Sequence, residues 1–252
     1  MNTTAPTVQM PELTHRERTI VIIGLMTGLL LAALDQTIVS TALPTIVGEF
    51  GGISHLSWVV TAYLLASTAS MPLWGKISDL YGRKRIYQTA IVLFLIASML
   101  CGLAQSLWQL IAFRGLQGIG GGGLMSLTFT IVGDIVPPRE RGRYTGYLTG
   151  TFALASVLGP LIGGVLTDHF SWRWVFYVNI PIGIVALFVT GVVLRLPFRR
   201  AEHRLDFIGS GLLVLSVVLV VAVIYLFLRS GRATLVPGVA LPLSEVPEPT
   251  PA

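Results

Sequence analysis

Two charged residues lie in stretches of the chain where charge is expensive. Asp35 falls in an apolar run from about residue 20 to 44, and Arg114 falls in another from about 107 to 135. A charge at the centre of a membrane helix costs roughly 2.5–3.5 kcal/mol on insertion scales, so such residues normally face a protein interior or a water-filled cavity. There a carboxylate is disfavoured in its ionised form unless a positive charge lies close to it. The two side chains can serve one site only if their helices bring them to the same depth.

The composition predicts an all-α integral membrane protein. Of the 252 residues, 53% are hydrophobic and only 12% are charged, whereas an ordinary soluble domain carries about 25% charge. Apolar runs recur at about 20 residues, the length that crosses ~30 Å of hydrocarbon. Because lipid offers no partners to backbone groups, these spans must be helical. The lipid bilayer is therefore an expected partner.

The apolar runs predict seven spans, at about residues 20–44, 57–76, 86–104, 107–135, 144–167, 174–194 and 207–228. Most of the 17 Lys and Arg residues fall in the amino-terminal tail and in the second, fourth and sixth loops. Basic loops stay in the cytoplasm, so the amino terminus is expected inside and the carboxy terminus outside. The predicted organisation is a cytoplasmic tail (1–19), a six-helix bundle (20–194), a cytoplasmic loop (195–206), a seventh helix (207–228) and a disordered extracytoplasmic tail (229–252). Basic residues explained by orientation give no reason to expect nucleic acid binding.

This orientation places Asp35 and Arg114 at a similar depth. Asp35 comes ~15 residues after the start of an outward-running span, about 22 Å from the cytoplasmic side at ~1.5 Å per residue. Arg114 comes ~7 residues into an inward-running span, about 10 Å below the outer side. Both belong to the outer half of the membrane and could share one cavity. The alternative is that each only snorkels or bonds to polar neighbours. Gln117 lies on the same helix face as Arg114, three residues on.

Two glycine-rich stretches predict close helix packing. Residues 118–123 formally match a dinucleotide fingerprint, but they lie inside a span with no preceding strand, so nucleotide binding is not expected. Small residues in membrane helices let backbones approach closely. Gly159 and Gly163 form such a pair in the fifth span, and Pro160 between them permits a kink. Simple helix packing and a bend at a gating interface both remain open for this stretch.

The second loop carries a charge pattern that topology does not explain. Asp79 and Arg83 are four residues apart, so one helical turn would bring them together. Acidic residues contribute little to orientation. No catalytic motif appears elsewhere: the sequence has no His-Glu-x-x-His pair and no Gly-x-Ser-x-Gly elbow. An enzyme, a metal site or a cofactor is therefore not expected.

Five stretches, each in the correct helix or loop, resemble the major facilitator superfamily and, within it, the 14-helix drug:proton antiporter branch. They are residues 34–44, 75–85, 110–118, 150–164 and 172–183. The resemblance implies a major-facilitator-type amino-terminal bundle of six helices plus a seventh helix. It covers about half the length of such a transporter. A truncated form is therefore expected, with the carboxy-terminal bundle absent or supplied by another chain.

The resemblance also implies roles for individual residues. The proton-coupling or substrate-binding group would be Asp35, Arg114 and Gln117. The conformational switch on the cytoplasmic side would be Gly75, Asp79, Arg83 and Asp134. The hinge between bundles would be Gly159, Pro160, Gly163 and Gly164.

The function that this resemblance implies is proton-coupled export of amphipathic or cationic compounds across the plasma membrane. Proton loading and cationic substrate would compete for the Asp35 carboxylate, with the proton gradient as the driving force. Rocking of two bundles around a mid-membrane site would supply alternating access. The alternative is a membrane remnant or a regulatory or binding subunit that does not transport.

Overall fold

The computed structural model describes residues 14–51 and 55–194. The described residues form seven helices: α1 (His15–Phe50), α2 (Leu56–Tyr81), α3 (Arg83–Gly102), α4 (Leu107–Ile135), α5 (Arg141–His169), α6 (Trp174–Tyr177) and α7 (Asn179–Val193). The predicted cytoplasmic loop (195–206), seventh span (207–228) and carboxy-terminal tail (229–252) lie outside the described residues.

Six stretches of the described chain are long and apolar enough to cross a membrane. Five are single helices, and the sixth runs from Trp174 to Val192 through both α6 and α7. The prediction of an all-α membrane protein with a six-helix bundle is confirmed. Several helices extend beyond the predicted spans; α1, for example, continues past Pro44, which lies inside the helix instead of ending it.

Local sequence accounts for where several helices begin and end. The Thr14 hydroxyl accepts from the Glu17 backbone N–H and the Glu17 carboxylate accepts from the Thr14 N–H, so a capping box starts α1. Gly82 has a φ of 94°, a conformation that favours glycine, and it alone separates α2 from α3. The expectation of one helical turn joining Asp79 to Arg83 is therefore wrong, since α2 ends at Tyr81 between them.

The sixth span is interrupted at Val178, between α6 and α7. Pro181 explains the interruption, because it has no N–H and cannot bond to the carbonyl of Tyr177 four residues earlier. Proline is tolerated within the first turn of a helix, where N–H groups lack helical partners anyway. The break leaves Asn179 as the first residue of α7.

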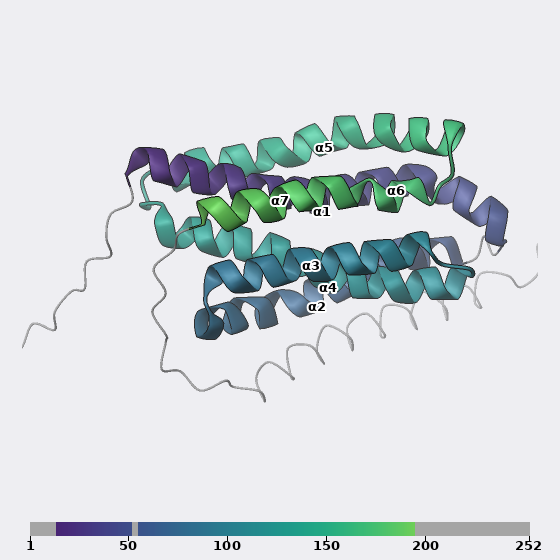
Figure 1. The fold of residues 1–252 in the computed structure, drawn as a ribbon, viewed down its shortest axis with the longest axis horizontal. Coiled ribbons are helices and arrows are strands. Elements are labelled where there is room, and N and C mark those ends of the chain that lie inside the picture. Colours follow the sequence, from purple (N-terminus) through teal and green to yellow (C-terminus); the bar gives the residue numbers. More distant parts are fainter. Residues whose placement is uncertain (1–13, 52–54, 195–252) are drawn as a thin grey trace, which may run out of the picture.

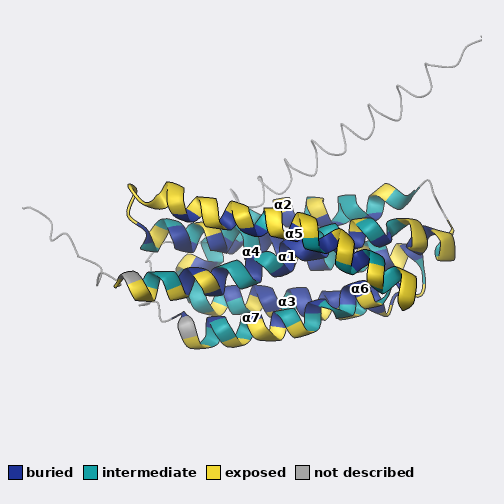
Figure 2. Ribbon diagram, turned by 90° about the horizontal axis from the view of Figure 1, so that it is seen from above, coloured by how far each residue is buried: buried dark blue, intermediate teal, exposed yellow. Residues whose placement is uncertain are grey.

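The helices lie side by side along the long axis of the molecule in two groups (Figure 1). In the α1 group, α1 packs against α5 and α7, with α6 continuing into α7; in the α4 group, α4 packs against α2 and α3. Buried residues line the interior and exposed residues, including many apolar ones on α5, face outward (Figure 2). Exposed apolar side chains are expected where a helix meets lipid or another bundle.

The glycine run of α4 brings its backbone against two neighbours. A Cβ on Gly118 would collide with the backbone carbonyl of Tyr63 on α2, and one on Gly120 would lie 2.7 Å from the backbone nitrogen of Phe94 on α3. The predicted close approach of helices at this run is confirmed. This run places α4 directly against the backbones of α2 and α3.

Candidate functional site

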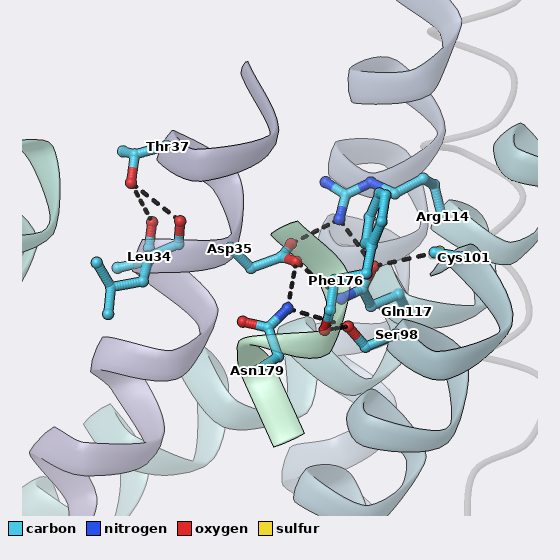
Figure 3. A network of polar contacts seen from close by, with 10 residues as sticks. Leu34, Asp35, Thr37, Ser98, Cys101, Arg114, Gln117, Phe176 and Asn179 are labelled. Atoms are coloured by element: carbon cyan, nitrogen blue, oxygen red, sulfur yellow. Dashed lines mark hydrogen bonds and ion pairs between the residues drawn. The ribbon is translucent and has the colours of Figure 1, made fainter. Parts of the chain in front are cut away.

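The structure brings Asp35 and Arg114 into direct contact (Figure 3). Arg114 Nη1 donates to Asp35 Oδ2 at 2.5 Å. The other carboxylate oxygen, Oδ1, accepts from Gln117 Nε2 at 2.9 Å and from Asn179 Nδ2 at 2.8 Å. One carboxylate from α1 is thus held by two groups of α4 and one of α7.

All four side chains are removed from the surface of the described bundle. Asp35, Gln117 and Asn179 are 0% exposed and Arg114 is 1% exposed. A buried charge pair stabilises a fold only when its remaining polar atoms are also satisfied. The amide donors of Gln117 and Asn179 supply that second layer of bonds on the carboxylate.

The polar cluster sits between two apolar cores. In α1, the buried apolar residues up to Ala32 belong to one core and those from Ala33 onward to the other. In α4 the order is reversed: Leu110 lies in the second core, Leu124 in the first, and the polar side chains fall between them. The same change of core occurs along α3, α5 and the α6–α7 span. The charges therefore occupy a distinct layer across the bundle.

Arg114 has further contacts within this layer. Its Nη1 also donates to Gln117 Oε1 at 2.8 Å, and its guanidinium lies 4.3 Å from the ring centroid of Tyr63 on α2. Cys101 Sγ donates to the same Gln117 oxygen at 3.5 Å. In the part of the chain that the structure describes, Arg114 Nε has no hydrogen-bond partner. Gln117 is thus fixed at both ends of its amide, by Asp35 on one side and by Arg114 and Cys101 on the other.

Asn179 is a member of this site that the predicted set of residues omits. Its Nδ2 also donates to Ser98 Oγ on α3 at 3.0 Å, and Ser98 Oγ donates to the carbonyl of Phe176 at 2.8 Å. Asn179 Oδ1 is buried and has no hydrogen-bond partner within residues 14–51 and 55–194. The signal in the sequence was a single amide in the apolar run 174–194, a position that polar residues occupy at a cost in free energy.

A second network joins the ends of α2, α3 and α4. Arg83 pairs with Asp79 at 2.6 Å and with Asp134 at 3.0 Å. The same guanidinium donates to the Gly75 carbonyl at 3.3 Å and to the Ser78 hydroxyl. All four residues predicted for the switch therefore meet at Arg83. Its side chain is 20% exposed and those of Asp79 and Asp134 are 48% and 42% exposed, so water screens these pairs.

The glycines predicted for a hinge do not all face the same way. A Cβ on Gly159 would collide with the Thr37 side chain of α1, and one on Gly163 would lie 3.0 Å from the Ile38 carbonyl. A Cβ on Gly164 would meet nothing within 4 Å. Pro160 lies within α5, which continues past it. Gly159 and Gly163 thus make the α1–α5 contact, while Gly164 takes no part in it.

Comparisons with known proteins identify the family. The family model of the Major Facilitator Superfamily matches residues 25–246. "Multidrug resistance protein 3" of Bacillus subtilis is 47% identical over 201 residues, covering 79% of this chain and 39% of that protein. "Multidrug transporter protein MdtP" of the same organism is 42% identical over 202 residues, covering 80% of this chain and 37% of that protein. The chain thus spans well under half the length of these curated relatives.

A solved transporter structure shares the fold of this chain. The crystal structure of the human organic anion transporter MFSD10 superposes with a TM-score of 0.64 at 23% identity, covering 81% of this chain and 54% of that one. The family match extends over most of the chain, and the helical bundle is shared with a solved transporter of low sequence identity. This chain, with its charged pair buried between two apolar cores, belongs to the major facilitator superfamily of membrane transporters.

Proposed function

We propose that this chain forms the amino-terminal bundle of a proton-coupled exporter of amphipathic or cationic organic compounds, of the 14-helix antiporter branch. The observation that carries the proposal is the buried pair of Asp35 and Arg114 with its amide partners. The names of the relatives, which refer to multidrug resistance and multidrug transport, support the class of substrate.

The pair suits a proton-binding role better than direct contact with substrate. Asp35 has no exposed surface in the described bundle, and Arg114 already occupies one of its oxygens. A cationic drug would have to displace Arg114 from a buried site to reach the carboxylate. A proton needs no such space. Substrate and proton then compete through the arrangement of helices, not for the same atoms.

Protonation of Asp35 is coupled to rearrangement by simple electrostatics. A neutral acid leaves the Arg114 guanidinium buried without a counter-charge, and breaking a buried pair in this way costs about 3–5 kcal/mol. The bundle can avoid that cost by moving Arg114 toward another acceptor or toward water. A change in proton occupancy thus favours a different packing of α1 against α4, which is what a coupled transporter requires.

The Arg83 network acts in the proposal as a latch at the cytoplasmic ends of α2, α3 and α4. Its bonds to Asp79, Asp134 and the Gly75 carbonyl hold three helix ends in one arrangement. Each exposed ion pair is worth only about 0.2–1 kcal/mol, so the latch can open during a transport cycle. The tight contact of Gly159 and Gly163 with α1 is the proposed hinge surface.

The proposal places the bundle in the plasma membrane with its amino terminus in the cytoplasm. A second bundle supplies the opposite wall of the transport path. That bundle belongs either to the same chain or to another one. A regulatory or binding subunit that does not transport is the second candidate.

A reconstitution experiment separates the two candidates. The chain is placed in liposomes with an imposed pH gradient, alone and together with the carboxy-terminal part of the Bacillus subtilis relative, and transport of the fluorescent cation ethidium is followed. Gradient-dependent transport in either sample, abolished by Asp35→Asn, supports the exporter. Transport that persists unchanged in Asp35→Asn refutes the proton role. Binding of ethidium without its transport, in both samples, supports the regulatory or binding subunit.

A further inference from the structure

We propose that Asn179 senses the protonation state of Asp35 by turning its side-chain amide, and that Ser98 passes this change to the break between α6 and α7. The inference rests on the proposed proton role of Asp35. It assigns a positioning role to a residue that lies outside the charged pair and in a different helix.

The neighbours of Asn179 fix its amide when Asp35 is ionised. A carboxylate oxygen can only accept, so the group facing Asp35 Oδ1 at 2.8 Å must be the NH₂. Ser98 uses its only proton on the Phe176 carbonyl, so its oxygen also accepts from that NH₂. The amide oxygen consequently points to a buried position without a partner. Such an unsatisfied acceptor is costly, so the position calls for a reason.

Once protonated, Asp35 needs a hydrogen-bond acceptor in place of one of its donors. One proton from water attaches to a carboxylate oxygen and no other covalent bond changes. On Oδ2 the new O–H would face the guanidinium of Arg114, which has no acceptor. On Oδ1 it would face two NH₂ groups, those of Gln117 and Asn179. One of these amides must present its oxygen if the acid is to donate.

Asn179 is the amide that can turn. The oxygen of Gln117 is already bound by Arg114 Nη1 at 2.8 Å and by Cys101 Sγ at 3.5 Å. The oxygen of Asn179 has no hydrogen-bond partner among the described residues. A half-turn of the Asn179 amide places its oxygen where its NH₂ was, so that it accepts from the acid.

Ser98 carries the change onward. Once Asn179 presents an oxygen, the Ser98 hydroxyl donates to it and no longer to Phe176. The Phe176 carbonyl lies at the end of α6, where Val178 interrupts the hydrogen-bonding pattern before α7. Loss of the Ser98 hydrogen bond leaves this carbonyl only its contact with the Val178 N–H, and the attachment of the break to α3 is weakened.

The other ionisable groups around Asp35 do not provide this acceptor. Arg114 of α4 is a donor. The Tyr63 ring of α2 lies against that guanidinium, and the Tyr63 hydroxyl, which has no partner among the described residues, lies beside Gly121, one turn beyond Gln117. Cys101 of α3 is bound to Gln117. Tyr177 of α6 packs on Gly102, α5 has no ionisable residue between 148 and 167, and α7 has none.

The composition of the chain allows a direct test. Asparagine occurs only at positions 2 and 179, and the dipeptide Phe-Tyr occurs only at 176–177. In the full chain in lipid nanodiscs, ¹⁵N-asparagine labelling gives two side-chain NH₂ signals, and Asn2→Ser identifies the one from Asn179. A ¹³C-phenylalanine, ¹⁵N-tyrosine sample gives one signal for the Phe176 carbonyl. Infrared difference spectra follow protonation of the carboxyl, with Asp35→Gln assigning the band.

We expect the Asn179 amide and Phe176 carbonyl signals to shift with the same pH midpoint as the Asp35 band. Asp35→Gln abolishes both shifts. Ser98→Ala abolishes the Phe176 shift and leaves that of Asn179. Thr190→Val, which removes another buried hydroxyl that touches only its own helix α7, changes neither.

Two results would overturn the inference. One is an Asn179 signal that stays fixed while the Asp35 band titrates. The other is a carboxyl that stays ionised at every pH at which the bundle is folded. Both are read from the wild-type chain, so they hold even if a variant fails to fold. Ethidium transport is measured separately. If the wild-type chain shows the coupled Asn179 and Phe176 shifts but no ethidium transport, the proposed function is contradicted and the role of Asn179 is not.

Discussion

Removing the Arg114 guanidinium should destabilise the bundle when position 35 is Asp and stabilise it when position 35 is Leu. Arg114→Met keeps a long apolar side chain and deletes the guanidinium, and Asp35→Leu deletes the carboxylate. In the wild-type chain, Arg114→Met leaves a buried carboxylate without its counter-charge. In Asp35→Leu, the same substitution removes a buried cation that has already lost its partner. The second substitution therefore repairs part of the damage caused by the first.

The magnitudes follow from the bonds at the site. Breaking a buried pair by removing one partner costs about 3–5 kcal/mol, so Arg114→Met should lose that amount. Asp35→Leu loses the same about 3–5 kcal/mol and also leaves the amides of Gln117 and Asn179 without their acceptor, at ~1–3 kcal/mol each. The double variant retains only the amide cost, roughly 2–6 kcal/mol. Adding Arg114→Met to Asp35→Leu should therefore regain about 3–5 kcal/mol.

The measurement is equilibrium unfolding of the four proteins in mixed detergent and SDS, followed by circular dichroism. If Asp35→Leu has no folded state even without SDS, recovery of a folded state in the double variant still gives the sign. Equal destabilisation by Arg114→Met in both backgrounds would mean that the two charges are not coupled. Asp35 and Arg114 would then not form a buried ion pair.

Two further predictions concern α4 and the latch. Gly118→Ala should destabilise the bundle by about 1–3 kcal/mol, because the new Cβ meets the Tyr63 backbone, and a backbone cannot rotate away as a side chain can. Gly115→Ala is the control. Its Cβ would meet no described atom within 4 Å, so it should be neutral or stabilising by up to about 1 kcal/mol. Equal effects of the two in thermal unfolding would contradict the close approach of α2 and α4. Asp134→Asn should change stability by less than about 1 kcal/mol, since its pair with Arg83 is exposed to water. It should nevertheless reduce ethidium transport in the co-reconstituted sample, and full transport would argue against a latch.

The depth of Asp35 and Arg114 in the membrane could be predicted from the sequence. Their hydrogen-bond partners could be predicted only in part. Counting residues from the helix ends places Asp35 and Arg114 at one level because the helical rise is fixed. The same periodicity places Gln117 beside Arg114. Counting says nothing about how α7 is rotated or how closely it approaches α1. Asn179 therefore could not be joined to Asp35 without the packing of the whole bundle.

Backbone conformation was the other limit. The spacing of Asp79 and Arg83 correctly indicated a contact, but the contact spans a turn made by Gly82 and is not within one helix. Likewise, the glycine pair of α5 indicated close packing without showing that Gly164 faces away from α1. Spacing along a helix gives relative faces, whereas the face that meets a neighbour depends on packing across the bundle.

The position of the buried pair gives it an effect that the other ion pairs do not have. Arg83 joins α2, α3 and α4, all within the α4 group, and Arg173 pairs with Glu49 at the end of α1, within the α1 group. Asp35 and Arg114 connect one group to the other, and Asn179 and Ser98 connect them again beside it. Above and below this layer the packing between the groups is mainly apolar, with hydrogen bonds from Tyr87 of α3 to the Leu25 carbonyl of α1 and from Lys84 of α3 to the Gly191 carbonyl of α7. If Asp35 takes up a proton as proposed, the charge attraction between the two groups is lost in this layer, while the ion pairs within each group are unaffected.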